Sequence, residues 1–355
     1  MIKNKKHIAV LIGITLCLIF SLATAQETYR AGTTSGNFLE LGYGSAGTAM
    51  GDAYVSVAKD ISSIYWNPAG LGYMQQSEFQ VMHQPWIAGI NTSFVGLGLV
   101  RPRWGTVAVG FIYTGYGEEE VTSMLMQEGT GEKFDGLDYS VSLSYGRKLA
   151  QWFSFGATGK YVSSRIWHES ASAVAFDLGA VVNTSFLSWT GKKDDGLSIG
   201  MSISNYGTRL QYNGIDLKRP IDEAPGEAGN FEYVPARYET QSWELPLIFR
   251  IGVSMYPILT STQRLTLAVD ALHPNNNSEY INMGGEYALT VPGIGIFSLR
   301  TGYKGAYMID SQYGWNFGFG LLFYYLNNRS LKIDYAYRDI GLLGKMHAYT
   351  LSLTF

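Results

Sequence analysis

The sequence of 355 residues predicts an all-β fold, a transmembrane β-barrel of fourteen antiparallel strands preceded by an N-terminal segment of different character. The first observation is a series of segments, each about ten residues long, with apolar side chains at every second position. Over residues 138–145, Tyr139, Val141, Leu143 and Tyr145 share one face, and an aspartate and three serines share the other. Such strands suit a barrel with lipid outside and an enclosed polar interior.

Two further observations predict the same fold. The chain contains 42 glycines, 25 tyrosines and 17 phenylalanines, a composition typical of closely packed barrel strands with aromatic girdles at the membrane interfaces. The connections between these segments alternate in length, one short and the next long. Bacterial outer-membrane barrels have this pattern, with short periplasmic turns and longer external loops. We therefore expect the bacterial outer membrane as the location and its lipid as the surrounding partner.

Residues 1–25 have the pattern of an export signal. Three lysines among the first six residues precede an apolar run over 8–20, and a small-residue cleavage site ends at Ala25. The alternative is an uncleaved anchor, but the run is shorter than the roughly 20 residues that a spanning helix needs. We expect the processed chain to begin after Ala25.

Composition excludes several classes of function for the processed chain. The single cysteine, Cys17, lies inside the signal, so disulfides, thiolate metal sites and cysteine nucleophiles are not expected. Removing the three signal lysines leaves 23 basic and 29 acidic residues, a formal charge of −6, which argues against a nucleic-acid partner. The four remaining histidines lack metal-ligand spacing, and no hydrolase elbow motif is present. No enzyme activity, metal or cofactor is expected.

Residues 26–76 do not alternate and form a separate N-terminal segment, predicted to act as a plug. The segment contains Gly51 and Asp52, then Asp60, and closes on a Trp-Asn-Pro-Ala-Gly-Leu run that includes Asn67, Pro68 and Ala69. Glycines permit tight turns and close approach to a wall, and the proline ends any preceding helix. The asparagine side chain can close a turn on nearby backbone. A purely structural role and a gating hinge are both open for this motif.

The alternation assigns the barrel to residues 77–355. The fourteen expected strands cover residues 77–86, 92–101, 104–113, 138–147, 152–162, 173–184, 197–206, 246–256, 264–272, 280–289, 295–304, 315–325, 330–338 and 346–355. The long connections are 114–137 and 207–245, and the turn at 185–196 is unusually long for its side. The last strand ends in Phe355 and resembles the insertion signal that the barrel-assembly machinery recognises.

If the apolar face contacts lipid, charged side chains must face the lumen, because a basic group at the bilayer midplane costs about 2–4 kcal/mol. These charges can be structural ion pairs or can select a permeant. The predicted lumen-lining charges are Asp177, Arg250, Asp270, Glu286, Arg300, Lys332, Asp334 and Arg338, together with Lys160 and Lys304.

The N-terminal motif resembles the signature of the PorV/PorQ family, outer-membrane proteins related to the FadL-like fatty acid transporters. The Asn-Pro-Ala-Gly-Leu run at 67–71 matches fully, whereas Ala46 replaces an expected arginine and Asp52 replaces the second glycine of a Gly-Met-Gly-Gly-Ala turn. The resemblance implies a fourteen-stranded barrel with an inward-folded plug. It also implies a component of the type IX secretion system that handles exported cargo.

Two features point to different partners for this barrel. The loop 207–245 is rich in tyrosine and proline and suits contact with protein, or serves as a lid over the barrel. The alternative function is FadL-type transport of a hydrophobic small molecule, for which Met124, Leu125 and Met126 are candidate contacts. A mainly structural barrel without transport is a third possibility.

Overall fold

The computed structural model describes residues 30–227, 233–325 and 329–355. The predicted export signal, residues 1–25, lies outside this part of the chain, as do Asn327 and Asn328 of one predicted turn. No helix among the described residues is long and apolar enough to cross a membrane.

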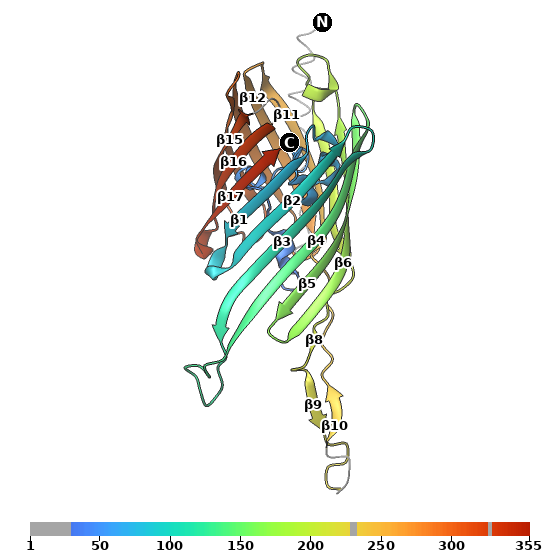
Figure 1. Cartoon of the computed structure of the whole chain (residues 1–355), viewed down its shortest axis with the longest axis vertical. Coiled ribbons are helices and arrows are strands. Elements are labelled where there is room, and N and C mark those ends of the chain that lie inside the picture. The colour runs from blue at the N-terminus through green and yellow to red at the C-terminus, as the bar shows by residue number, and fades with distance from the viewer. Residues whose placement is uncertain (1–29, 228–232, 326–328) are drawn as a thin grey trace.

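Within the described ranges, fourteen strands form the wall of one closed antiparallel barrel, which confirms the predicted fold (Figure 1). Each wall strand pairs with its neighbours along the barrel, and the first strand also pairs with the last. The wall strands are β1 (Glu78–Pro85), β2 (Asn91–Arg101), β3 (Gly105–Glu120), β4 (Lys133–Ala150), β5 (Phe153–Ile166), β6 (Glu169–Asn183), β7 (Ser198–Gly207), β11 (Ile248–Leu259), β12 (Gln263–Pro274), β13 (Tyr280–Val291), β14 (Gly295–Ala306), β15 (Trp315–Tyr325), β16 (Arg329–Asp339) and β17 (Lys345–Thr354).

The alternation of side chains separates the two faces of the wall as the sequence pattern predicts. On β4, Leu143 and Tyr145 are 62% and 41% exposed, whereas the alternating residues Ser142 and Ser144 are at most 4% exposed. Outward apolar side chains from adjacent strands pair in register, for example Val141 with residues of β3 and β5. This outer surface is the one that suits lipid.

The two long connections contain more β-structure than the sequence pattern predicts. β3 and β4 continue beyond the barrel, pairing Glu118 with Asp135 and Glu120 with Lys133. Charged residues occur on both faces there, so the alternation that marks a membrane strand is lost although the strands continue. The second connection contains β8 (Asn213–Gly214), which pairs with β6, and a ribbon of β9 (Lys218–Ile221) with β10 (Val234–Arg237).

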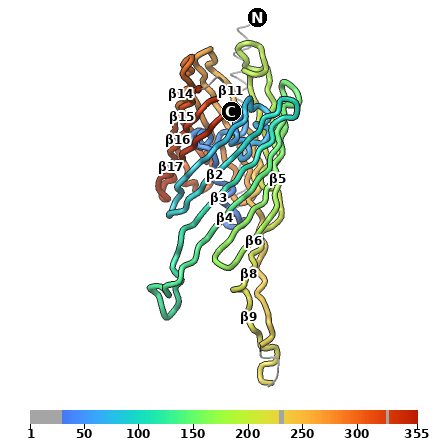
Figure 2. Tube along the Cα trace, viewed as in Figure 1, coloured from blue at the N-terminus to red at the C-terminus, as the bar shows by residue number. Residues whose placement is uncertain are grey.

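Both long connections leave the same end of the barrel. The β3–β4 hairpin and the β9–β10 ribbon project from the lower end in Figure 1, and Figure 2 traces the same path. β17 finishes towards the opposite end. Short 3-10 helices complete the connections: η3 (Ile87–Gly89), η4 (Lys193–Asp195) and η6 (Gly341–Leu343).

The core lies inside the barrel, where residues 30–76 pack against the wall; we call these residues the inner segment. The segment consists of short helices joined by turns: η1 (Asn37–Glu40), α2 (Ser45–Ala49), α3 (Ser63–Trp66) and η2 (Pro68–Tyr73). Tyr43, Met50, Trp66 and Leu71 are at most 1% exposed. The inner segment therefore fills the lumen and supplies the apolar core that an outward-facing barrel lacks.

Candidate functional site: the inner segment and the charged lumen

Asn67 connects three parts of the structure. Its Oδ1 accepts a hydrogen bond from the backbone N–H of Ala69 at 3.1 Å, which closes the local turn. Its Nδ2 donates to the carbonyl oxygens of Val55 at 2.9 Å and Ala180 of β6 at 3.2 Å. Asn67 alone separates the end of α3 at Trp66 from the start of η2 at Pro68. The motif therefore attaches the inner segment to the wall as well as shaping a turn.

A row of glycines forms the surface beneath this turn. Gly146, Gly156 and Gly179 pair across β4, β5 and β6 and face the lumen. A Cβ atom on Gly146 would lie 2.6 Å from Cβ of Leu71, and one on Gly179 would lie 2.8 Å from Cδ of Pro68. Only glycine allows the turn to approach the wall this closely. We call these three residues the glycine floor.

The inner segment contacts the opposite wall at a second close approach. A Cβ atom on Gly51 would lie 2.6 Å from the backbone nitrogen of Tyr303. Asp52 follows with a φ of +64°, in the left-handed region that favours glycine. Glycine, which the motif resemblance leads us to expect at this position, would adopt this conformation without strain. In this chain, Asp52 instead supplies a carboxylate to the lumen.

Asp52 is held by two basic side chains of the wall. Its Oδ1 accepts a hydrogen bond from Nη2 of Arg338, and its Oδ2 lies 2.7 Å from Nζ of Lys304. Arg338 also donates to Oδ1 of Asn316 at 2.8 Å. Burial raises the pKa of Asp52, but Arg338 and Lys304 outweigh burial and hold that pKa below its ordinary value. The carboxylate is therefore ionised at neutral pH.

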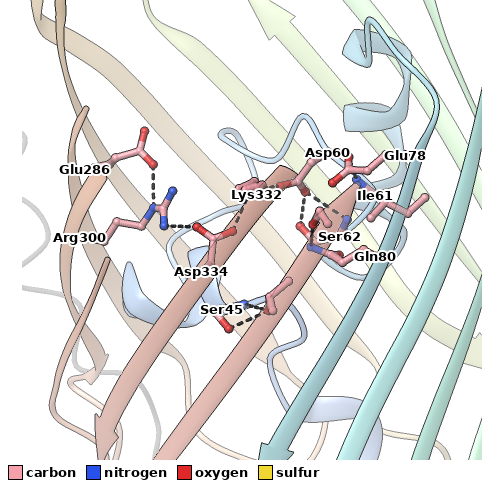
Figure 3. Close-up of polar contacts among 12 residues, drawn as sticks. Ser45, Asp60, Ile61, Ser62, Glu78, Gln80, Glu286, Arg300, Lys332 and Asp334 are labelled. Carbon is pink, nitrogen blue, oxygen red and sulfur yellow. Dashed lines mark hydrogen bonds and ion pairs between the residues drawn. The ribbon is translucent and has the colours of Figure 1, made fainter. Parts of the chain in front are cut away.

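A chain of alternating charges lies along the same wall strands, β14 and β16, and extends to β13 and β12 (Figure 3). Glu286 accepts from Arg264 and Arg300 at 2.7 Å each, and Arg300 reaches Asp334 at 2.6 Å. Lys332 continues the chain, with Nζ 3.2 Å from Oδ2 of Asp334. The register between β13 and β14 places Glu286 directly opposite Arg300. Buried charges persist when they are paired in this way.

Asp60 of the inner segment ends this chain. Its Oδ2 lies 3.0 Å from Nζ of Lys332, and its Oδ1 accepts from the hydroxyl of Ser62 at 2.5 Å. Burial raises the pKa of Asp60, whereas Lys332 and Ser62 together lower it below the ordinary value. The six charges, from Arg264 to Asp60, balance to zero. We call them the charge chain.

The other predicted lumen charges take separate positions. Asp270 accepts the backbone N–H groups of Tyr54 and Val55 at 2.7 and 2.9 Å, so it also binds the inner segment. Arg250 lies 5.5 Å from the ring centroid of Tyr65. Asp177 pairs with Lys160 at 2.6 Å within the wall.

Sequence reasoning missed the polar inward positions of β1 and the role of Arg264. Glu78, Gln80 and Gln84 are at most 5% exposed and alternate with outward residues. That alternation was the signal that could have identified them. Conversely, Met124 and Leu125 are 95% and 96% exposed at the tip of the β3–β4 hairpin. Among the described residues, no cluster of three or more His, Cys, Asp or Glu is placed to hold a metal ion.

Comparison with known proteins identifies the fold. No protein-family model matches the sequence, and no curated protein matches it. The CymD monoaromatic hydrocarbon channel matches with a TM-score of 0.54 at 10% identity, over 88% of this chain and 96% of that one. The toluene transporter TbuX of Ralstonia pickettii gives 0.55 at 9% identity, over 88% and 97%. The toluene transporter TodX of Pseudomonas putida gives 0.51 at 11% identity, over 88% and 96%.

At these identities the likeness shows the fold alone. The chain has a FadL-like fourteen-stranded barrel, which agrees with the wider resemblance of its N-terminal motif. Membership of the PorV/PorQ branch stays a prediction, as do the assignment of 26–76 as a plug and of 77–355 as a barrel domain.

Proposed function

We propose that this chain is a bacterial outer-membrane channel for neutral hydrophobic small molecules, with the inner segment as its plug. The observation that carries the proposal is a closed barrel of the hydrocarbon-channel fold whose lumen is filled by its own N-terminal segment. A filled lumen does not suit a free ionic pore. The charge chain balances to zero, which favours a structural role for these charges over selection of an ionic permeant.

An apolar cluster lies where a hydrophobic molecule would first meet the inner segment. Leu210 and Leu245, from the connection between β7 and β11, are at most 3% exposed beside Phe38 and Leu39 of the inner segment. The long connections are expected on the outside, so this cluster lies beneath the outer loops. Passage then requires the inner segment to shift relative to the wall.

The test is uptake of labelled toluene by a bacterial host that lacks its own hydrocarbon channels. We expect the full chain to raise uptake above that of cells with an empty vector. A host that shows no increase, although the folded barrel is present in its outer membrane, would overturn the proposed function.

A reversible cross-link tests the movement of the plug. Oγ of Ser45 lies 2.7 Å from Oγ1 of Thr350 on β17, and the processed chain has no native cysteine. In the double variant Ser45→Cys/Thr350→Cys, we expect oxidation to stop uptake and reduction to restore it. Uptake that continues with the cross-link formed would remove the movement step and leave the channel itself standing.

Handling of exported cargo in type IX secretion is the second candidate. The observation that favours it is the projecting β9–β10 ribbon, near which Tyr233 and Tyr238 are 76% and 65% exposed. Exposed tyrosines are common at protein-binding hot spots. Pull-down from the native organism should then recover secretion components, and recovery should fall when residues 211–239 are deleted. Recovery of no such component would count against this candidate.

Two further partners are proposed from the same architecture. The outward apolar face suits outer-membrane lipid. The last strand presents Phe355, 49% exposed, for recognition by the barrel-assembly machinery.

A further inference from the structure

A row of inward polar side chains runs across five adjacent strands of the wall, with one residue on each strand. The sheet register places these residues opposite one another in turn, from β1 to β5. All are at most 6% exposed. The row consists of Gln84, Thr92, Thr114, Asp138 and Ser164.

One end of this polar row is satisfied within the protein. Asp138 accepts the hydroxyl of Tyr116 at 2.6 Å and that of Ser164. Ser164 in turn lies 2.6 Å from the hydroxyl of Tyr212, in the connection between β7 and β8. Every side chain at this end therefore has a partner.

The other end differs. Gln84 is 1% exposed, and within the described residues neither its Oε1 nor its Nε2 has a hydrogen-bond partner. Its matched neighbour Gln80, on the same face of β1, donates from Nε2 to Ser352 at 3.1 Å, and within the described residues only its Oε1 lacks a partner. Buried amides without partners are rare because desolvation of both polar atoms is left uncompensated.

Gln84 lies opposite Thr92, whose hydroxyl already donates to the backbone carbonyl of Gln84. The side chains at the neighbouring inward positions are apolar. Met82 and Phe94 pair in register one inward position away, and each is 1% exposed. Trp86 follows on the other side and packs against the same core. A few polar groups among aromatic and aliphatic side chains are the usual composition of a small-molecule site, in which those polar groups fix the orientation of the ligand.

We propose that Gln84 binds the hydroxyl group of an otherwise hydrophobic ligand, such as a phenol or an alcohol. An amide offers one acceptor and one donor face, and a hydroxyl group both donates and accepts. The match therefore holds for either orientation of the amide. The only charged member of the polar row is Asp138, which disfavours a carboxylate ligand. The inference rests on the proposed function and specifies the substrate class.

The experiment compares two ligands of similar shape, p-cresol and p-xylene, by equilibrium binding to the detergent-solubilised full chain. We expect p-cresol to bind about tenfold more tightly, as one hydrogen bond to a buried amide allows. Gln84→Met should remove this preference and leave p-xylene binding unchanged or stronger. Gln80→Met is the matched control, because it makes the same chemical change on the same face, and it should keep the preference.

The outcomes separate the two proposals. Equal binding of both ligands to the wild type, or a preference that survives Gln84→Met, would overturn the inference and leave the channel function standing. Survival of the preference would mean that a group other than Gln84 binds the hydroxyl. Binding of neither ligand would count against the proposed function itself. Folding of each variant is checked by heat-modifiable gel mobility. If Gln84→Met does not fold, Thr114→Val is the second test: the Thr114 hydroxyl, in the same row, has no partner within the described residues, and its loss is expected to weaken p-cresol binding.

Discussion

Replacement of Gly156 with valine is expected to detach the inner segment from the glycine floor. A Cβ atom there would lie 2.6 Å from the backbone nitrogen of Ala69 and would also meet the backbone of Pro68. Neither the wall nor the turn can move aside cheaply, because both contacts involve backbone. Overpacking of this kind costs about 1–3 kcal/mol. Since that cost falls on the docked state, the lumen should open while the barrel stays closed.

Two measurements follow this displacement. Ion conductance in planar bilayers should rise from a low baseline to that of a water-filled pore, and trypsin should cleave after Lys59, which is partly buried in the wild type. Gly159→Val on the same strand is the control. The nearest atom to a Cβ there is 3.8 Å away, so we expect wild-type conductance. A Gly156→Val barrel that is folded, closed to ions and resistant to trypsin would contradict the docking role of the glycine floor.

The sequence predicts the wall well because alternation is a direct consequence of having lipid on one side. The expected strand at 315–325 coincides with β15, and that at 264–272 lies inside β12. Prediction fails where the chain leaves the membrane: β3 was expected to end at residue 113 and continues to Glu120. Beyond the bilayer, a strand no longer needs an apolar face, so nothing in the pattern records its continuation.

For the inner segment, the sequence predicts local turns but not the contacts that the segment makes with the wall. Turn closure by Asn67 follows from local chemistry, but its bonds to Val55 and Ala180 depend on where the segment docks. The pairing of Asp60 with Lys332 joins residues 272 positions apart. The sequence identified both residues without indicating that they meet. Long-range pairs of this kind are set by packing, which no local period encodes.

Loss of Lys332 is expected to destabilise the folded chain more than loss of any exposed lysine. Within the described residues, Lys332 joins Asp60 to the charges of the wall, and its side chain is 17% exposed. In Lys332→Met, Asp60 keeps only Ser62 as a partner, and Asp334 keeps Arg300. Removing one partner of a buried pair typically costs about 3–5 kcal/mol, because the remaining carboxylate stays desolvated. Denaturant unfolding in detergent, followed by gel mobility, measures this loss.

A double variant shows whether the loss of stability comes from the carboxylate of Asp60 that Lys332→Met leaves without its ion-pair partner. Asp60→Asn removes that charge, so Lys332→Met/Asp60→Asn should be more stable than the sum of the single changes predicts, by about 1–3 kcal/mol. Lys133→Met is the control, because Lys133 lies 3.5 Å from Glu118 in a pair whose side chains are 57% and 68% exposed, and such pairs contribute at most about 1 kcal/mol. Equal losses for Lys332→Met and Lys133→Met would show that the charge chain does not fix the inner segment. Additive effects at Lys332 and Asp60 would show that Lys332 stabilises the barrel wall without acting through the plug.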